Sequence, residues 1–168
     1  MKSIIPSLCF PDNNGEEAIH YYISVFPDSE LVELVRYPRE ELDIHFQGMT
    51  DKVLSARFNL NHQPFLGTDG GPYFQFSEAI SFTIECRDQA EIDYYWSKLS
   101  HVPEAEQCGW CKDRFGVSWQ IVPDNMAKLL VTDEQIHAMM AMKKILVDEL
   151  RAAGAGNQDE PGTVGTGK

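Results

Sequence analysis

Two segments of this chain, one beginning at Ala18 and the other at Glu91, read like copies of each other. Residues 18–26 and 91–99 share an Ile-x-Tyr-Tyr-x-Ser pattern and a final apolar residue. The same offset continues downstream, where residues 32–37 align with residues 105–110. A repeat of this length indicates that one supersecondary unit is used twice and that the copies bury their faces on each other. We expect a crevice between two such modules, and we expect function there.

Residues 3–69 read as the first module. A strand is expected at 3–10, a helix follows until Pro27 stops it, and strands are expected at 31–37, 53–60 and 63–68. The third of these alternates, which predicts Leu54, Ala56, Phe58 and Leu60 on one face and Val53, Ser55, Arg57 and Asn59 on the other.

The polar segment at residues 38–52 predicts a long loop or flap. A run of about fifteen residues without regular structure is unusual inside a compact domain, which favours a functional lid. The Gly-Gly-Pro run at 70–72 marks the expected joint between the modules.

Residues 77–123 read as the second module. Strands are expected at 79–86, 105–112 and 117–122, with a helix at 89–99. Two βαβββ modules of mostly antiparallel sheet make the predicted fold class α+β.

The C-terminal part lies outside the repeat. Thr132 and Gln135 form a capping box that opens a predicted helix running to about Ala152. Sequence from residue 154 onward has almost nothing to bury, which predicts a disordered tail at 154–168. We therefore expect a single domain at residues 1–153, with its helical extension at 124–153.

The charge balance is strongly acidic. The 168 residues carry 26 Asp and Glu against 14 Lys and Arg, a net charge of −12. A field of that sign repels phosphate backbones and anionic membranes, so it argues against nucleic-acid and membrane binding. The sequence has no recognisable signal peptide or membrane-spanning run, and the cytoplasm is the expected compartment, where the four cysteines stay reduced.

The repeat and one motif resemble a known family. A duplicated strand-helix-strands module is typical of the vicinal oxygen chelate superfamily, which has the glyoxalase and bleomycin-resistance fold. Residues 107–123, Gln-Cys-Gly-Trp-Cys-Lys-Asp-Arg-Phe-Gly-Val-Ser-Trp-Gln-Ile-Val-Pro, resemble the closing motif of its PhnB-like branch, often labelled demethylubiquinone methyltransferase-like. Residues 10–27, the Gly-Gly-Pro run with Phe74 and Phe76, and residues 142–145 extend the resemblance over about residues 3–150.

The resemblance implies where a site would lie. In metal-dependent relatives the first and last strands of each module give one ligand each, usually His and Glu. The equivalent positions here are Ser7, Thr68, Ser81 and Gln120. These side chains offer only neutral oxygens, whereas divalent transition metals prefer imidazole, thiolate or carboxylate ligands. We therefore expect a chain without the superfamily metal site and without a cofactor.

Other side chains are candidates for a ligand pocket. His45 in the flap suits a general base over the crevice, with plain solvent exposure as the alternative. Arg57 suits bidentate binding of an anionic group, with pairing to a nearby acid as the alternative. Aromatic and amide groups complete the set: Phe65, Phe74, Gln107 and Trp110.

The Cys-Gly-Trp-Cys run at 108–111 lies in a predicted strand, where its two thiols point to opposite faces. That placement favours structural cysteines over a redox pair.

We interpret the chain as a small-molecule binding protein or a metal-independent enzyme of the PhnB-like branch. One alternative is a metal-dependent lyase, isomerase or dioxygenase of the glyoxalase type, and another is a drug-sequestering protein like the bleomycin-resistance members. The methyltransferase label is disfavoured because a Rossmann-type adenosylmethionine site needs a glycine-rich turn between a strand and a helix. The Met-rich C-terminal helix predicts a homodimer, and whether modules pair within a chain or between chains stays open.

Overall fold

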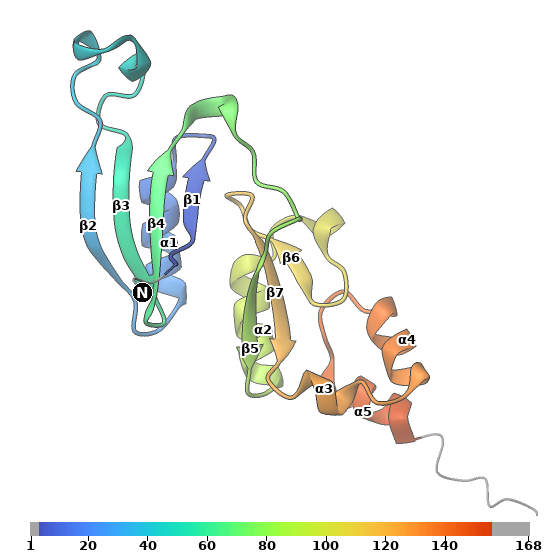
Figure 1. Cartoon of the computed structure of the whole chain (residues 1–168). Coiled ribbons are helices and arrows are strands. Elements are labelled where there is room, and N and C mark those ends of the chain that lie inside the picture. The colour runs from blue at the N-terminus through green and yellow to red at the C-terminus, as the bar shows by residue number, and fades with distance from the viewer. Residues whose placement is uncertain (1–3, 156–168) are drawn as a thin grey trace, which may run out of the picture. The chain divides into compact units, whose positions relative to one another are not determined.

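The computed structural model describes residues 4–155 and consists of two units. The first unit ends at Ser77 and the second begins at Glu78. Each contains helices and one small sheet, which confirms the predicted α+β class (Figure 1). Among the described residues, no helix has both the length and the apolar character needed to cross a membrane.

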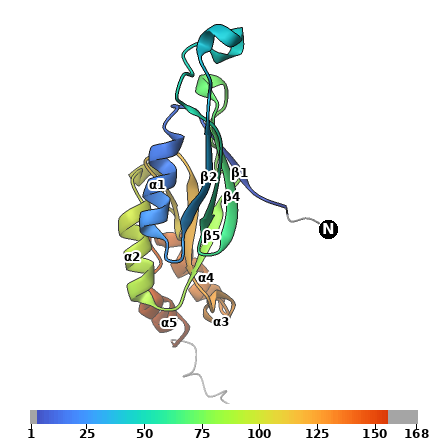
Figure 2. The same cartoon turned by 90° about the vertical axis from the view of Figure 1, so that its left-hand side faces the viewer.

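The first unit follows the predicted order of strand, helix and three strands. Its elements are β1 (Ser7–Phe10), α1 (Gly15–Val25), β2 (Glu30–Arg36), β3 (Val53–Leu60) and β4 (Gln63–Asp69). The sheet order is β1-β4-β3-β2, with β1 parallel to β4 and the other pairs antiparallel. The helix α1 covers one face of this sheet (Figure 2). A Cβ on Gly67 would lie 3.1 Å from the end of the Ile19 side chain, so a larger residue there would force Ile19 to shift by a few tenths of an ångström.

The buried carboxylate of Asp69 joins three elements of the first unit. Its Oδ1 accepts a hydrogen bond from the Gly15 N–H and its Oδ2 accepts one from the Val53 N–H, both at 2.8 Å. The first of these satisfies a backbone donor in the opening turn of α1, which has no partner within the helix. A Cβ on Gly15 would lie 2.7 Å from Oδ1, so the helix must begin with glycine here. One side chain thus fixes where α1 and β3 begin relative to the end of β4.

The predicted alternation of β3 is wrong at its first two residues. Val53 is 1% exposed and Leu54 is 39% exposed, the reverse of the expectation. The pairing of β2 with β3 shifts between Val35 and Arg36, which leaves one extra residue on β3. Such a bulge moves the side chains beyond it to the opposite face. From Ala56 to Leu60 the buried and less buried residues alternate as predicted.

The segment between β2 and β3 is the irregular flap that the sequence predicts. It contains two short 3-10 turns, η1 (Glu40–Leu42) and η2 (Ile44–Phe46). The Tyr37 N–H donates to the Lys52 carbonyl at 2.8 Å, and the Tyr37 and Phe46 rings meet edge to face. The flap is therefore closed at its base by its own contacts, and its role as a lid stays a prediction.

The second unit has two strands after its helix, as predicted for residues 77–123, which is one fewer than a full βαβββ module. Its sheet elements are β5 (Phe82–Cys86), α2 (Gln89–Leu99), β6 (Trp110–Lys112) and β7 (Ser118–Pro123), and the sheet order is β5-β7-β6. The helix α2 packs on one face of the sheet and buries Ile92 and Tyr95, just as α1 buries Ile19 and Tyr22.

The strand expected at residues 105–112 is reduced to β6. A 3-10 turn, η4 (Pro103–Ala105), precedes it, and Cys108 and Gly109 have positive φ angles of 50° and 86°. Positive φ angles turn the chain and end strand pairing. The alignment of residues 32–37 with residues 105–110 is therefore wrong at the level of structure, because the first segment is mostly strand and the second is mostly turn.

The single C-terminal helix that the capping box predicts is wrong. The chain forms α3 (Met126–Leu129), α4 (Asp133–Ala141) and α5 (Val147–Ala155), with the predicted Thr132–Gln135 capping box opening α4. The helix breaks after Ala141 because the carbonyls of Met142 and Lys143 accept hydrogen bonds from Cys108 and Gly109, at 2.8 and 2.7 Å. Most of the tail predicted to be disordered, residues 156–168, lies outside the described residues.

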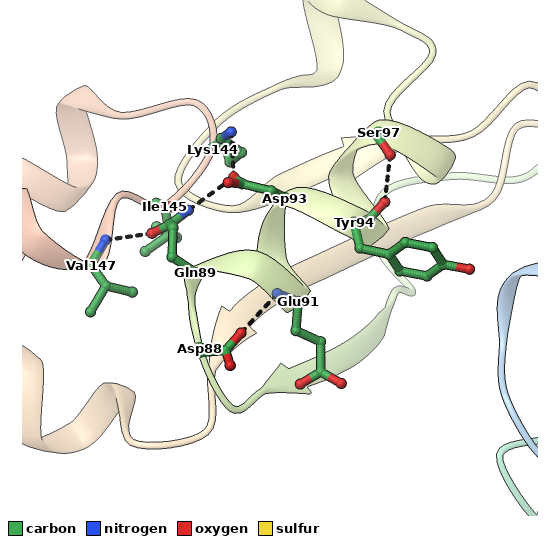
Figure 3. A network of polar contacts seen from close by, with 9 residues as sticks. All are labelled: Asp88, Gln89, Glu91, Asp93, Tyr94, Ser97, Lys144, Ile145 and Val147. Atoms are coloured by element: carbon green, nitrogen blue, oxygen red, sulfur yellow. Dashed lines mark hydrogen bonds and ion pairs between the residues drawn. The ribbon is translucent and has the colours of Figure 1, made fainter.

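The side chain of Gln89 holds the segment between α4 and α5 against α2. Its Nε2 donates to the Ile145 carbonyl at 3.1 Å, and its Oε1 accepts the Val147 N–H at 2.9 Å (Figure 3). The Gln89 amide thus donates one hydrogen bond to this backbone segment and accepts one from it, the same pair that a residue of a neighbouring β-strand would make. Asp93, one turn further along α2, accepts from Gln89 and pairs with Lys144.

Replacing Asp69 is expected to destabilise the protein. Asp69→Ala leaves two buried N–H groups without partners, which costs about 3 kcal/mol in the free energy of unfolding measured by urea denaturation. Asp69→Asn keeps one acceptor oxygen and should lose about half as much. Asp12→Ala, a substitution at an exposed position, serves as the control and should change stability by less than about 0.5 kcal/mol. Equal stability of Asp69→Ala and Asp12→Ala would contradict the role of this carboxylate.

Replacing Gln89 is expected to loosen the C-terminal segment. In Gln89→Ala the Val147 amide loses its acceptor, so its hydrogen exchange, read by NMR, should quicken by about tenfold. Gln63→Ala removes an exposed glutamine in the first unit and should leave this rate unchanged. Unaltered exchange at Val147 in Gln89→Ala would show that other contacts hold the segment.

Candidate functional site

The best-defined polar surface of the second unit lies on the sheet face that α2 does not cover. Along β7 the buried Trp119 and Ile121 point toward α2, so Ser118 and Gln120 point to the other face. Strand pairing extends this face to both neighbours of β7. We call it the Gln120 face, and its members are Ser81, Thr83, Glu85, Trp110, Lys112, Ser118, Gln120 and Val122.

Gln120 lies at the centre of this face. Its Cα is paired with Thr83 on β5 and with Trp110 on β6. Its Nε2 donates to the Ser81 hydroxyl at 2.8 Å, which fixes the orientation of the amide. Within the described residues the Oε1 atom of Gln120 and the indole N–H of Trp110 have no hydrogen-bond partner. The face therefore offers a hydrogen-bond acceptor and a donor from two residues that are paired across β6 and β7.

A charged group lies beside this amide. Lys112 is paired with Ser118 across β6 and β7, and its ammonium group forms an ion pair with Glu78. Its side chain is 21% exposed, against 61% for Glu78. The Ser118 hydroxyl is buried and has no partner among the described residues. An unsatisfied buried hydroxyl is uncommon in native proteins and calls for an explanation.

The turn before β7 sets the register of this face. Asp113 is buried, and its Oδ1 accepts hydrogen bonds from the N–H groups of Phe115 and Val117 at 2.8 and 3.0 Å. Its Oδ2 accepts the Trp119 indole N–H at 2.8 Å. This carboxylate closes the β6–β7 turn and holds Trp119 on the α2 side. Gln120, the next residue, consequently faces away from α2.

In the first unit the candidates Ser7, Thr68 and Arg57 lie on the sheet face away from α1. Ser7 pairs with Leu66, whereas Thr68 pairs with Cys9, so these two predicted positions are two residues out of register. The Thr68 hydroxyl donates to the Leu54 carbonyl at 2.9 Å.

Arg57 lies between Leu66 and Glu33 in the strand order of the first sheet. Its guanidinium forms no hydrogen bond or ion pair within residues 4–155. The pairing with an acid that the sequence analysis offered as an alternative is therefore not formed with Glu33, its nearest neighbour on the strand.

The remaining candidates lie elsewhere. Phe65 is buried on the α1 side, stacked on Phe58 at 5.5 Å between ring centroids. Phe74 is 60% exposed after β4. Gln107 donates to the Met140 carbonyl at 2.6 Å and so holds α4.

His45 lies in the flap, with its side chain 86% exposed and its Nδ1 2.7 Å from Asp43. Hydrogen bonds from the His45 backbone N–H, and next from its ring, lower the pKa of the Asp43 carboxyl. The structure thus gives His45 a carboxylate partner on the flap itself.

The donor atoms at the four superfamily ligand positions do not fit a divalent metal ion. Ser7, Thr68, Ser81 and Gln120 supply hydroxyl and amide oxygens only, and two of them are engaged by hydrogen bonds to each other. Among residues 4–155, no group of three or more His, Cys, Asp or Glu side chains is placed to hold a metal ion. Metal-dependent chemistry therefore has no support from this donor set.

The cysteines differ in environment. Cys108 precedes β6 in a turn, so the prediction that both thiols of the Cys-Gly-Trp-Cys run lie in a strand is wrong. Its Sγ lies 3.6 Å from the Met140 Sδ. Burial raises the pKa of the Cys86 and Cys111 thiols to about 12. Burial, and next the charge of Asp69, raise the pKa of Cys9.

Lys112, Ser118 and Thr83 were not predicted from the sequence. The first two flank the turn predicted at residues 113–116, but their pairing depends on the hydrogen bond from the Asp113 N–H to the Val117 carbonyl, which shifts the register by one residue. Alternation along β7 then places Ser118 on the same face as Gln120. The parallel pairing of Thr83 with Gln120 had no local signal, since it depends on the crossover through α2.

Comparisons with known proteins agree on one family. The model of the family described as 3-demethylubiquinone-9 3-methyltransferase matches residues 2–122. A PhnB protein from Bacillus cereus is 30% identical, with a TM-score of 0.58 over 72% of this chain and 99% of that one. A Pseudomonas aeruginosa protein, 20% identical, has a TM-score of 0.56 over 73% of this chain and 98% of its own, and shows the fold alone. No functionally curated protein matches the chain.

Thiol labelling is expected to separate the four cysteines. The thiolate is the reactive form, and a pKa of about 12 leaves Cys86 and Cys111 protonated at pH 8. With Ellman's reagent at pH 8, the half-buried Cys108 should react first and Cys9 more slowly. Cys86 and Cys111 should react only in guanidinium chloride. Fast labelling of either buried thiol in the folded protein, located by mass spectrometry, would contradict this order.

Proposed function

The chain belongs to the PhnB-like family whose model is described as 3-demethylubiquinone-9 3-methyltransferase, and we propose that it is a small-molecule binding protein with its ligand on the Gln120 face. The observation that supports this most directly is the state of Gln120. Its Nε2 is committed to Ser81, whereas its Oε1 is left as an acceptor beside an aromatic ring. A ligand that presents an O–H or N–H group satisfies this acceptor.

The composition of the face also favours binding. Pockets for small molecules combine apolar or aromatic surface with a few fixed polar groups. Trp110 supplies the aromatic surface, and the Gln120 amide is fixed by its hydrogen bond to Ser81. Strand positions hold such groups more rigidly than loops do, which lowers the entropic cost of binding.

The family description names a methyl transfer, and the turns of this chain do not favour it. Adenosylmethionine sites of the Rossmann type use a glycine-rich turn from a strand into a helix. Three turns of the described chain lead from a strand into an α-helix: residues 11–14, Pro-Asp-Asn-Asn, residues 87–88, Arg-Asp, and residues 124–125, Asp-Asn. None of them contains the run of glycines that allows a backbone to approach a phosphate or a cofactor closely. We therefore propose binding without methyl transfer.

A ligand screen tests this function. We expect some members of a metabolite library to raise the melting temperature of the wild-type protein, because a ligand that binds only the folded state stabilises it. Gln120→Leu should weaken binding of these compounds by about tenfold in isothermal titration calorimetry, through loss of the fixed amide. Gln63→Leu, the same substitution at an exposed position of the first unit, is the matched control and should bind as the wild type does. A library without a stabilising compound, or equal affinities in Gln120→Leu and the wild type, would overturn the proposal.

A further inference from the structure

We propose that the ligand of the Gln120 face carries a carboxylate, and that Glu78 occupies the place of this carboxylate on Lys112 in the free protein. The inference rests on the proposed function, because it names the chemical class bound at the same face. Three observations carry it: the environment of Lys112, the position of Glu78, and the unpartnered hydroxyl of Ser118.

Lys112 is the cation of the Gln120 face. It extends from β6 beside Ser118, and its side chain is largely buried. An ammonium group in such a position requires an anionic or hydrogen-bonding partner. Within the described residues Glu78 is its one ion-pair partner. A ligand that binds to this face therefore lies next to a lysine that is already paired with a carboxylate.

Glu78 is suited to being replaced. It lies in a turn before β5, outside every helix and strand, and its side chain is 61% exposed. Because the Glu78 carboxylate is the exposed side of this ion pair, it keeps part of its hydration and solvent screens its attraction to Lys112. Removing Glu78 from Lys112 breaks no backbone hydrogen bond of the sheet, since β5 begins at Phe82. A ligand carboxylate can take the same place at low cost.

Ser118 gives the carboxylate a second partner. Its hydroxyl is buried and without a hydrogen bond among the described residues, and its Cα is paired with that of Lys112. Glu78 leaves this donor unsatisfied. A carboxylate has two oxygens, so one that accepts from the Lys112 ammonium can also accept from the Ser118 hydroxyl.

The rest of the face defines the rest of the ligand. Trp110 lies two residues before Lys112 on β6, on the same face, and offers a ring surface next to the anion position. Gln120 is paired with Trp110 and offers its Oε1 as an acceptor. The ligand class that these groups fit is a small carboxylic acid with an aromatic ring and an O–H or N–H donor for Gln120.

The probes that test this inference are 4-hydroxybenzoate and 4-hydroxybenzamide, written benzoate and benzamide below. They share shape, carry the same O–H donor for the Gln120 Oε1, and differ in charge. Binding is followed by NMR through the Trp110 indole N–H and the Gln120 side-chain NH₂ signals. We expect the wild-type protein to bind benzoate at least about tenfold more tightly than benzamide, as a charge-assisted hydrogen bond implies. Lys112→Met should remove this preference and leave benzamide binding unchanged.

Two further variants complete the test. Lys112→Arg keeps the positive charge and should keep the preference for benzoate, which separates loss of charge from loss of fold. Glu78→Gln removes the competing charge and should bind benzoate several-fold more tightly than the wild type.

Two results would overturn the carboxylate inference: equal benzoate affinity in the wild type and Lys112→Met, or weaker benzoate binding in Glu78→Gln. The proposed function fails separately. If ligands bind in a way that Gln120→Leu weakens and Lys112→Met does not change, the binding face stands and the carboxylate inference fails. If Lys112→Met weakens benzoate binding and Gln120→Leu does not, the carboxylate position stands and the proposed role of Gln120 fails.

Discussion

The second unit depends on one buried carboxylate, that of Asp113. Two of its hydrogen bonds close the turn between β6 and β7, and the third holds the Trp119 indole on the α2 side of the sheet. Because side chains of a strand alternate, the position of Trp119 determines that of Gln120 and Ser118. The pairing of Lys112 with Ser118 follows from the same turn. The orientation of the polar face that we propose for a ligand thus depends on the hydrogen bonds that the Asp113 carboxylate accepts.

The two units use a buried aspartate at different places for a similar purpose. Asp69 is the last residue of β4 and accepts hydrogen bonds from the first residues of α1 and of β3, which are distant in sequence. Asp113 lies in a turn, and its hydrogen-bond donors all belong to the same hairpin, with Trp119 the furthest along the chain. Each carboxylate accepts hydrogen bonds from N–H groups that would otherwise be buried without partners. The difference explains why residues 113–116 were readable as a turn from sequence, while the long-range role of Asp69 was not.

Local patterns predicted most of the fold, and long-range contacts account for what they missed. The helices at Gly15–Val25 and Gln89–Leu99 followed from apolar spacing and caps. The C-terminal helix failed because Cys108 and Gly109, far away in sequence, bind the backbone at Met142 and Lys143. The alternation of β3 failed because of a bulge that only its pairing with β2 reveals. In each case the missing information was a partner, which no local pattern contains.

The candidate site divides in the same way. Gln120, Ser81 and Trp110 were predicted from the sequence and lie together on the Gln120 face. Phe65 was also predicted as a pocket residue, but it is buried against Phe58 on the α1 side of the sheet of the first unit. The groups at the centre of this face, an amide, hydroxyls and an indole, carry no negative charge with which to hold a metal ion, yet they suit recognition by hydrogen bonds and stacking. Its one cation is already paired with a carboxylate of the same chain. In the carboxylate proposal a ligand replaces Glu78 on Lys112, so Lys112 rather than Gln120 determines which ligands the face prefers.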